Sequence, residues 1–403
     1  MREKHVDILY INTVDYGSTG KIMKQMSAAA ELSGYKTCCA IAGEKEKKNN
    51  GCLIISSYTV RRINELFDRV FSVRGYDSFL STLIFLRKLD RLNPRIIHLH
   101  NLHSNYINLP LLFRYIKKRN IKIIWTLHDC WAFTGRCPHF VALSCEKWKD
   151  GCKRCIYPTE CYPIANHDRS AYMWKQKKKW FTGVKNLTIV TPSQWLEGLV
   201  EQSFLNCYPI KVVTNGIDLS IFKRTISTFK QEHIIPADRY VVLGVAFSWN
   251  NNKGLDCFIE LAKRLNPEKY VIVLVGTDEN VESYLPKHII SVQKTKNQQQ
   301  LAEIYSVADV FVNPTRQEVL GLVNLEALAC GTPVITFNTG GSPECVDETC
   351  GCVVDCNDVD GLEKQIRYIC ENHPFTHEMC EQRARKFCKE NMLSKYLELY
   401  KIR

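Results

Sequence analysis

Short runs of hydrophobic residues alternate with longer amphipathic stretches along the whole chain. Stretches with a helical spacing, such as 20–35 and 297–308, lie between the runs. Near-continuous apolar strands separated by helices are typical of parallel sheets that are covered on both faces. The pattern therefore predicts an α/β fold with strands at 6–12, 95–100, 121–128, 187–193, 210–216, 240–247, 269–276, 288–292, 308–314 and 332–337.

The alternation stops over residues 219–239, a polar stretch without a clear period. We place a domain boundary there, which predicts two Rossmann-like domains at 1–225 and 226–385, followed by a terminal helix at 386–403. Ligands of open α/β sheets bind at the carboxyl ends of the strands. Two such domains are therefore expected to face each other across a central cleft and to share one site.

Charge and hydropathy narrow the class of protein. The 403 residues carry a net charge of +12, and no apolar run approaches the length of about 18 residues that a membrane span needs. The first residues, MREKHVDILYIN, are typical of a strand rather than a signal peptide. We expect a cytoplasmic protein that attracts anionic partners, such as phosphates, anionic lipid or nucleic acid.

A glycine loop follows the first expected strand. The stretch DYGSTGKI contains Gly17, Ser18, Thr19 and Gly20 just before a helix. Strand, glycine loop and helix together direct backbone N–H groups and a helix N-terminus at an anion. The alternative is a tight turn that Ser18 or Thr19 caps.

Three histidines stand at or just after strand ends, where an α/β fold places its chemistry. His100 ends the run 95–100 and His103 follows it, and His128 ends the run 121–128. Asp129 comes next to His128, and an adjacent acid can fix the tautomer of a histidine. We interpret His128 as a candidate for sugar binding or acid–base chemistry, and the other two as structural or at the acceptor rim.

The insertion at residues 130–161 is rich in cysteine. Cys137, Cys145, Cys152 and Cys155 have a spacing that ends in a C-x-x-C knuckle, with His139 as a spare ligand. Such a set can build a structural zinc site. Free thiols or a redox disulfide are the alternatives.

A basic and aromatic stretch occupies residues 172–181, YMWKQKKKWF. A solvated helix face is one interpretation. Docking on an anionic membrane surface is the other, with the aromatic rings at headgroup depth. Because no recognised nucleic-acid motif accompanies the stretch, we predict membrane contact rather than nucleic-acid binding.

The second half of the chain resembles a known family. The stretch ADVFVNPTRQEVLGLVNLEALACGTPVITFNTGGSPE (308–344) contains an E-x7-E spacing, and TGG-x-PE follows it. These features, with NGID (215–218), TPSQWL (191–196) and GSTGKI (17–22), resemble glycosyltransferase family 4, the group 1 transferases with the GT-B fold. HDCWAFTGRCPHF (128–140) and the cysteine segment resemble the bacterial capsule and exopolysaccharide branch.

The resemblance implies a role for each matching residue. Glu318 matches the acid that contacts the donor sugar, Glu326 the acid that binds the ribose, and Lys253 the lysine that neutralises the diphosphate. Gly17 to Gly20 are implied to approach the diphosphate, and His128 to line the sugar and acceptor side. The catalytic residues are expected to be Glu318, His128 and Lys253, with Leu320, Gly321 and Leu322 also along the donor site.

One position departs from the family pattern. Many members carry an arginine five residues before the lysine, where this chain has Ser248. Either Arg316 substitutes for that arginine, or Lys253 and backbone dipoles hold the leaving group.

No metal-binding D-x-D stands at a strand end, because DVD at 358–360 is typical of a helix start. We therefore expect a metal-independent enzyme that needs no cofactor beyond its nucleoside-diphosphate-sugar co-substrate. Family membership implies retention at the anomeric carbon. Since a double displacement needs a protein nucleophile and none is evident, front-side displacement is favoured.

The sequence thus predicts a retaining glycosyltransferase that moves a sugar from a nucleotide sugar to a glycan or a polyprenyl-diphosphate-linked acceptor, at the inner face of the plasma membrane. Two alternatives stay open. One is a phosphorylase or sugar-nucleotide epimerase of the same fold, and the other is a non-catalytic, zinc-stabilised protein that binds an anionic polymer.

Overall fold

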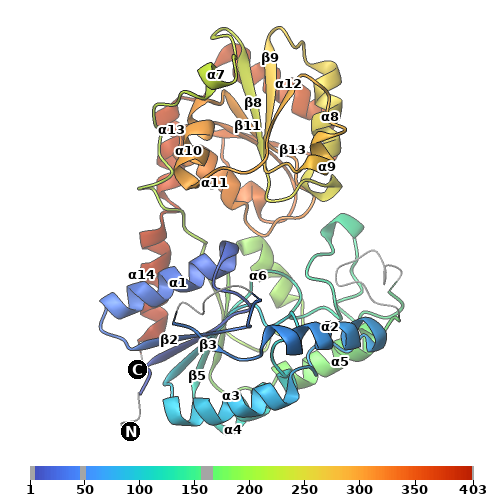
Figure 1. Ribbon diagram of the computed structural model, residues 1–403, viewed down its shortest axis with the longest axis vertical. Helices are drawn as coiled ribbons and strands as arrows, with labels where there is room; N and C mark the ends of the chain where they lie inside the picture. Colours follow the sequence, from blue (N-terminus) through green and yellow to red (C-terminus); the bar gives the residue numbers. More distant parts are fainter. Residues whose placement is uncertain (1–4, 46–50, 156–166, 402–403) are drawn as a thin grey trace. The chain divides into compact units, whose positions relative to one another are not determined.

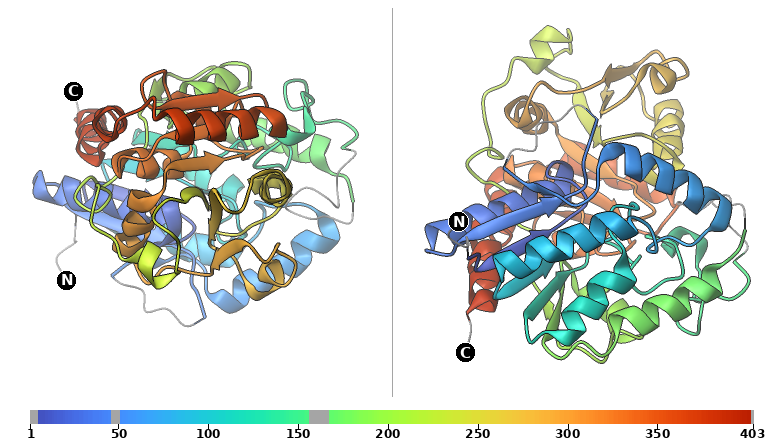
Figure 2. Two further views of the ribbon diagram at one scale, coloured as in Figure 1. Left: turned by 90° about the horizontal axis from the view of Figure 1, so that it is seen from above. Right: turned by 60° about the horizontal axis from the view of Figure 1, so that its bottom comes forward.

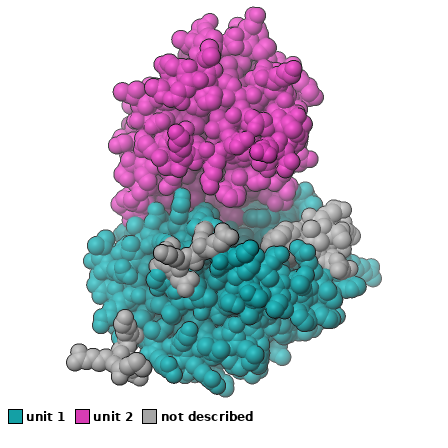
Figure 3. All heavy atoms as spheres, viewed as in Figure 1, with its two compact units in different colours: residues 1–213, 393–403 teal, residues 214–392 magenta. Residues whose placement is uncertain are grey.

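The fold consists of two α/β units, each built around a parallel sheet (Figure 1). The computed structural model describes residues 5–45, 51–155 and 167–401. Unit 1 comprises residues 1–213 and 393–403, and unit 2 comprises residues 214–392; Figure 3 colours them separately. The predicted fold class is confirmed at the level of two parallel-stranded α/β sheets.

Unit 1 contains a seven-stranded sheet with the order β3-β2-β1-β4-β5-β6-β7, in which every pairing is parallel. Its strands are β1 Ile8–Ile11, β2 Thr37–Ile41, β3 Leu53–Ile54, β4 Ile96–Leu99, β5 Lys122–Thr126, β6 Leu187–Thr191 and β7 Ile210–Val212. Its helices are α1 Gly17–Leu32, α2 Tyr58–Phe71, α3 Phe79–Leu92, α4 Leu109–Lys118, α5 Ser170–Phe181 and α6 Gln194–Glu201, with a short 3-10 turn at Val141–Leu143.

Unit 2 contains a six-stranded parallel sheet with the order β10-β9-β8-β11-β12-β13. Its strands are β8 Tyr240–Val245, β9 Tyr270–Val275, β10 Ile289–Val292, β11 Val310–Asn313, β12 Val334–Phe337 and β13 Gly351–Val354. Its helices are α7 Phe229–Glu232, α8 Leu255–Arg264, α9 Glu279–Glu282, α10 Gln298–Val307, α11 Leu322–Ala329, α12 Val359–Asn372 and α13 His377–Arg385, and α14 Lys389–Tyr400 follows.

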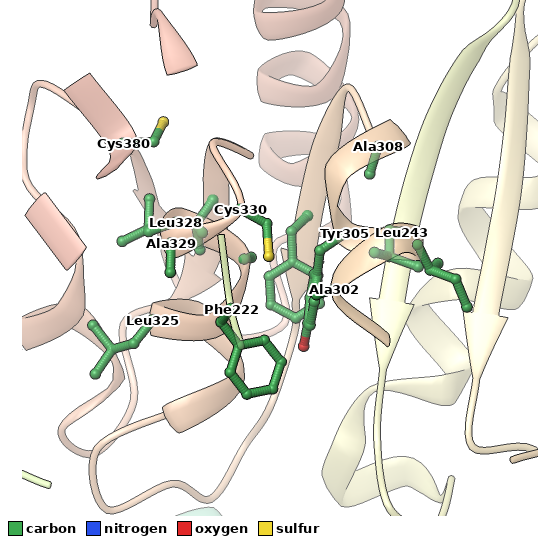
Figure 4. Packing of buried hydrophobic residues seen from close by; sticks show 14 of the residues in the cluster. Phe222, Leu243, Ala302, Tyr305, Ala308, Leu325, Leu328, Ala329, Cys330 and Cys380 are labelled. Carbon is green, nitrogen blue, oxygen red and sulfur yellow. The ribbon is translucent and has the colours of Figure 1, made fainter. Parts of the chain in front are cut away.

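Both faces of the sheet in unit 2 are buried, as the continuous apolar strands predict. Alternate residues of β8 and β9 point to opposite cores, for example Val241 and Leu243 to one and Val242 to the other. The first core includes residues of α10, α11 and α13, of which Figure 4 shows Tyr305, Leu325 and Leu328. The second includes residues of α8 and α12. The views in Figure 2 show these helices covering the sheet.

The division between the units lies between Val213 and Thr214, earlier than the boundary at 225/226 that the sequence suggested. The intervening residues belong to unit 2 because Ile217 and Phe222 are buried in its core. These two side chains are too widely spaced in a polar stretch to produce a recognisable pattern. The segment around Ile217 also pairs with Cys388 as an isolated parallel bridge.

The terminal helix differs from the prediction in its extent. It spans Lys389–Tyr400 rather than 386–403, and it belongs to unit 1 only from Leu393 onward. Tyr396 and Tyr400 are buried in unit 1. There the Tyr400 hydroxyl lies 2.8 Å from His98 Nδ1, and the Tyr396 hydroxyl lies 3.0 Å from Thr126 Oγ1. Polar pairs therefore fix the end of the chain to the sheet of unit 1.

Candidate active site

Glu318 lies on the loop between β11 and α11, not within the helix. Its Oε2 lies 3.0 Å from Lys253 Nζ, and its Oε1 accepts a hydrogen bond of 3.2 Å from the Val319 backbone N–H. Gly321, with φ of 88°, is the N-cap of α11. A positive φ of this kind favours glycine. The two candidate groups that the sequence separates by 65 positions are thus brought together by the fold of unit 2.

Lys253 ends a 3-10 turn at Asn251–Lys253, immediately before α8. Gly254 follows it with φ of 76°, and a Cβ at that position would approach Pro314 O within 2.4 Å. The Lys253 and Glu318 side chains are 37% and 23% exposed. An ion pair this open to water contributes about 0–1 kcal/mol. The pair therefore holds both groups in place, yet opening it to admit a ligand costs little.

Glu326 lies in α11, and its Oε2 accepts a hydrogen bond of 3.3 Å from the Tyr305 hydroxyl. Burial and the nearby Glu326 carboxylate raise the pKa of Tyr305 well above its ordinary value. The phenol therefore stays a hydrogen-bond donor at neutral pH. The half-buried carboxylate is held on one side by this donor, and carboxylate oxygens can accept further hydrogen bonds from ligand hydroxyls.

A buried polar network lies beneath the Glu318 loop. Asn313 Nδ2 donates to Asn324 Oδ1 at 2.7 Å, and Asn324 Nδ2 donates to Ser342 Oγ at 2.9 Å. Ser342 Oγ also lies 2.6 Å from Thr336 Oγ1. Such a buried hydrogen-bonded network fixes its members in one arrangement. The sequence analysis missed Asn324 and Ser342, although both lie within the stretches that carry the family resemblance.

Gly340 and Gly341 contact Glu318 through the backbone. The Gly341 N–H donates to Glu318 O at 3.2 Å. Gly340 has φ of 59°, and a Cβ there would lie 1.8 Å from Glu318 O. The TGG segment is therefore glycine-rich because the Glu318 backbone passes directly against it.

The structure argues against Arg316 as the substitute for the arginine that Ser248 replaces. Both terminal nitrogens of Arg316 bond the Asp256 carboxylate, at 2.8 and 2.7 Å, and Nε donates to Asn357 Oδ1 at 2.6 Å. The guanidinium also bonds the Asn251 backbone carbonyl. Arg316 thus fastens the loop after β11 to the start of α8, and it positions Lys253 rather than offering a charge to a ligand. Ser248 is exposed.

The neighbouring leucines have a packing role in this loop. Leu320 is 2% exposed, its carbonyl accepts a 2.8 Å hydrogen bond from Cys345 Sγ, and Leu322 packs against the same core. Their predicted contacts with a donor would therefore run through the backbone of Leu320, Gly321 and Leu322.

In unit 1, the four residues of the glycine loop form the first turn of α1, which begins at Gly17. The first helical hydrogen bond of α1 runs from the Gly20 N–H to Tyr16 O. The backbone N–H groups of Gly17, Ser18 and Thr19 come before this bond in the helix. The alternative, a cap by Ser18 or Thr19, is wrong, because the N-cap residue is Tyr16, whose hydroxyl bonds Glu44 instead of the helix. Gly20 has a structural reason as well, since a Cβ would lie 2.5 Å from the Asp15 backbone.

The histidines of unit 1 pair differently from the expectation. His128 Nε2 lies 3.0 Å from His100 Nδ1, and their rings stack with centroids 5.3 Å apart. Asp129 bonds His103 Nε2 at 3.0 Å instead of orienting His128. Although burial raises it, the His103 imidazole lowers the pKa of Asp129 to about 2 overall. Burial also lowers the pKa of His128 to about 4, so His128 is a neutral hydrogen-bonding group at pH 7.

Acid is expected to destabilise unit 1 through these histidines. Burial lowers the pKa of His98 to about 3 and that of His128 to about 4, against about 6.5 for an unfolded imidazole. Below pH 6.5 the unfolded chain takes up protons that the folded chain does not. The stability is therefore complete above pH 6.5 and is lost progressively toward pH 4, by about 2 kcal/mol per histidine at pH 5.

Urea unfolding at pH 7 and pH 5 measures this loss. His128→Asn is expected to lose about 2 kcal/mol less than the unmodified chain over this range, whereas His233→Gln, at an exposed position of unit 2, is expected to keep the full loss. Equal losses in all three proteins would contradict the assignment.

The prediction that α5 docks its aromatic residues on a membrane is wrong for three of the four, since of these only Tyr172 is exposed. Trp174, Trp180 and Phe181 are buried, and Trp174 Nε1 donates to Trp148 O at 2.8 Å. Lys177 is buried too, where its Nζ donates to Trp131 O at 2.7 Å. The helix instead anchors the cysteine-rich insertion, whose Phe133 and Trp148 rings pack 5.2 Å apart.

The four cysteines of the zinc prediction line one cavity of about 200 Å³, together with Arg136 and Ser170. Burial raises the pKa of Cys152 to about 11, and its sulfur accepts the Gly135 N–H at 3.1 Å. Among the described residues, no group of three or more Cys, His, Asp or Glu side chains is placed to hold a metal ion. Residues 156–161 of the insertion lie outside the described residues. The zinc site stays a prediction, which metal analysis tests.

Two protein-family models match the chain, one over most of unit 2 and one over most of unit 1. Residues 225–387 match the family described as Glycosyl transferases group 1, and residues 45–221 match Glycosyltransferase Family 4. The chain belongs to this glycosyltransferase family. The resemblance inferred from the sequence is thereby confirmed.

Relatives of this glycosyltransferase include a named polysaccharide enzyme and solved structures. The putative colanic acid biosynthesis glycosyl transferase WcaC of Escherichia coli K12 is 26% identical over 324 residues, 76% of each chain. Sucrose-phosphate synthase from Thermosynechococcus elongatus superposes with a TM-score of 0.71, at 17% identity and 98% of each chain. Anabaena Alr3699/HepE in complex with UDP-glucose gives 0.66, at 13% identity, over 98% of this chain and 99% of that one. These structures confirm the GT-B fold.

Proposed function

We propose that this protein is a retaining glycosyltransferase that moves a hexose or related sugar from a nucleotide sugar to a glycan or lipid-linked acceptor in surface polysaccharide biosynthesis. The observation that supports the proposal best is the 3.0 Å pair between Lys253 Nζ and Glu318 Oε2, on glycine-shaped loops at the carboxyl ends of β8 and β11. Open α/β sheets bind ligands at this edge.

Each group of unit 2 has a role in the proposed reaction. Lys253, at a helix start, stabilises the negative charge that develops on the departing nucleoside diphosphate. Glu318 accepts hydrogen bonds from the donor sugar next to the bond that breaks. Glu326, braced by Tyr305, accepts those of the ribose. In unit 1, the first turn of α1 is the candidate diphosphate contact, and His128 is the candidate sugar contact.

The chemical step transfers a glycosyl group without redox change. The bond between the anomeric carbon and the diphosphate oxygen breaks, and a bond from that carbon to the acceptor oxygen forms on the same face. The acceptor hydroxyl proton passes to the departing diphosphate. We propose this front-side route, with no metal ion required, because the charge is met by a lysine and helix N-termini.

Two relatives support the choice of substrates. HepE is described in complex with UDP-glucose, which supports a nucleotide-sugar donor. WcaC is named for colanic acid biosynthesis, which supports a polysaccharide product. Among the described residues no helix has the length and hydropathy to cross a membrane. We propose action at the cytoplasmic face of the membrane, without nucleic acid as a partner.

The test is an assay for nucleoside-diphosphate release. A panel of nucleotide sugars is first screened for thermal stabilisation, since a ligand that binds only the folded state raises its stability. The stabilising donor is expected to release nucleoside diphosphate only when an acceptor is added. Release with inorganic phosphate alone indicates a phosphorylase, and interconversion of the sugar without release indicates an epimerase. Either result would replace the proposal, as would a protein that no nucleotide sugar stabilises.

A further inference from the structure

Helix α2 directs three polar side chains, Arg61, Asn64 and Asp68, toward the rest of unit 1. Asn64 Nδ2 donates to Ser78 Oγ at 2.8 Å and to Asn105 O at 3.2 Å. Arg61 Nη1 donates to Gly43 O at 3.0 Å. Asp68 is 6% exposed and pairs with Arg74 at 2.8 Å. The inward side of this helix is therefore held by polar contacts instead of apolar packing.

The outward side of α2 is hydrophobic. Ile63, Leu66, Phe67, Val70 and Phe71 are each between 46% and 61% exposed. Their spacing of i, i+3, i+4, i+7 and i+8 places them on one side of a helix. The rings of Phe67 and Phe71 stack 5.8 Å apart. A helix on a water-exposed surface normally turns its polar residues outward and its apolar residues toward the core. The exposed apolar side of α2 is therefore suited to an apolar contact.

Helix α3 extends the hydrophobic surface. Its first turns expose Phe79, Leu80 and Ile84, which are between 54% and 72% exposed. The start of α3 lies beside α2, because Asn64 bonds Ser78, the residue before the helix. Both helices are labelled on unit 1 in Figure 1. We call the eight exposed residues the apolar surface: Ile63, Leu66, Phe67, Val70, Phe71, Phe79, Leu80 and Ile84.

Basic residues border this surface. In α2, Arg62 and Arg69 are exposed three or four positions from Leu66, and Arg62 forms a salt bridge with the partly exposed Glu65. In α3, Arg87 and Arg91 continue the stripe that Leu80 and Ile84 begin. Exposed basic residues of the two helices outnumber exposed acidic ones, since Asp90 is the exposed acid among the described residues of α2 and α3. Asp90 is itself engaged by Arg119 and Tyr115.

Apolar side chains flanked by exposed arginines match the chemistry of an anionic lipid surface, where apolar groups enter the acyl boundary and cations meet the headgroups. We propose that the apolar surface of α2 and α3 docks this protein on an anionic membrane. A second copy of the chain is a poorer occupant, because self-association through this surface would bring its arginines together. The inference deepens the proposed function, since a lipid-linked acceptor is presented at a membrane.

Vesicle co-sedimentation of the full chain tests the proposal without donor or acceptor. The unmodified protein is expected to bind vesicles of phosphatidylcholine with 30% phosphatidylglycerol and to stay free of pure phosphatidylcholine vesicles. The double variant Leu66→Ser/Phe67→Ser is expected to lower the bound fraction at least about tenfold. Arg62→Gln/Arg69→Gln is expected to weaken binding and its dependence on salt. Leu32→Ser, at a 92% exposed position of α1, is the matched control and keeps full binding.

Three results would overturn the proposal. The first is vesicle binding by the Leu66/Phe67 variant equal to that of the control. The second is a lower melting temperature of that variant in the absence of vesicles, which would show that the protein itself covers the surface. The third is a change from dimer to monomer in that variant. Nucleoside-diphosphate release with a soluble acceptor is measured separately. If the protein does not bind vesicles but still releases nucleoside diphosphate, the membrane-docking proposal fails and the proposed glycosyltransferase function stands.

Discussion

Glu318→Gln is expected to lower kcat for sugar transfer about 100- to 1,000-fold, the usual effect of removing one preorganised polar group from a reacting centre. Glutamine has the same shape, but it removes the charge next to Lys253 and replaces one acceptor oxygen with a donor. The affinity for the donor should fall less, because the proposed ribose and diphosphate contacts are left unchanged. The melting temperature should hardly change, since the ion pair that is lost is partly exposed. Acceptor-dependent release of nucleoside diphosphate measures the effect.

Glu348→Gln is the matched control for this change. Glu348 is an exposed acid of the same unit, and its replacement should leave kcat and KM unchanged. If Glu318→Gln released nucleoside diphosphate at the rate of the control, Glu318 would have no part in the chemistry.

Gly340→Ala is expected to lower the free energy of unfolding by about 2–4 kcal/mol and to weaken donor binding. The new Cβ would lie 1.8 Å from Glu318 O, so the Glu318 backbone must move. The residue would also be held at φ of 59°, which alanine disfavours. Urea unfolding followed by fluorescence measures the stability, and titration calorimetry with the stabilising nucleotide sugar measures the affinity.

Gly198→Ala separates this effect from a general cost of replacing glycine. Gly198 lies within α6, and a Cβ there would meet nothing within 4 Å. That variant is expected to be neutral or more stable by about 0.5–1 kcal/mol. If the Gly340→Ala protein were as stable as the Gly198→Ala protein, the Glu318 loop could move away from the new Cβ without a loss in the free energy of unfolding.

The strands were predictable wherever the sequence had a run of branched apolar residues. All ten predicted runs contain a strand, whereas β2, β3 and β13 were missed. β2 has the sequence TCCAI and β13 the sequence GCVV, in which cysteine, glycine and threonine dilute the hydrophobic signal. β3 has two residues, fewer than any periodicity can reveal. These three segments form strands because they pair with neighbouring strands of their sheets, and such pairing is not visible in the local sequence pattern.

The local positions of the candidate site residues were predictable, but their contacts were not. Local spacing placed Glu318 on a loop and Gly321 at its turn, and the structure confirms both positions. The pairing of His128 with His100 rather than Asp129 depends on which strands are neighbours in the sheet. The burial of Lys177 depends on the insertion that folds over it. Contacts between distant segments of this kind have no signature in a single sequence.

The C-terminal helix also determines how this chain can be divided. Residues 214–392 are enclosed in sequence by the two parts of unit 1, and Tyr396 and Tyr400 complete a polar cluster around His98 that would otherwise be left open. A protease that cuts once between Val213 and Thr214 would therefore leave a fragment that still carries the last segment of the first unit. An expression vector for the first unit alone needs residues 393–403 supplied as a fused or separate peptide, whereas the second unit is continuous and can be produced from a single uninterrupted stretch.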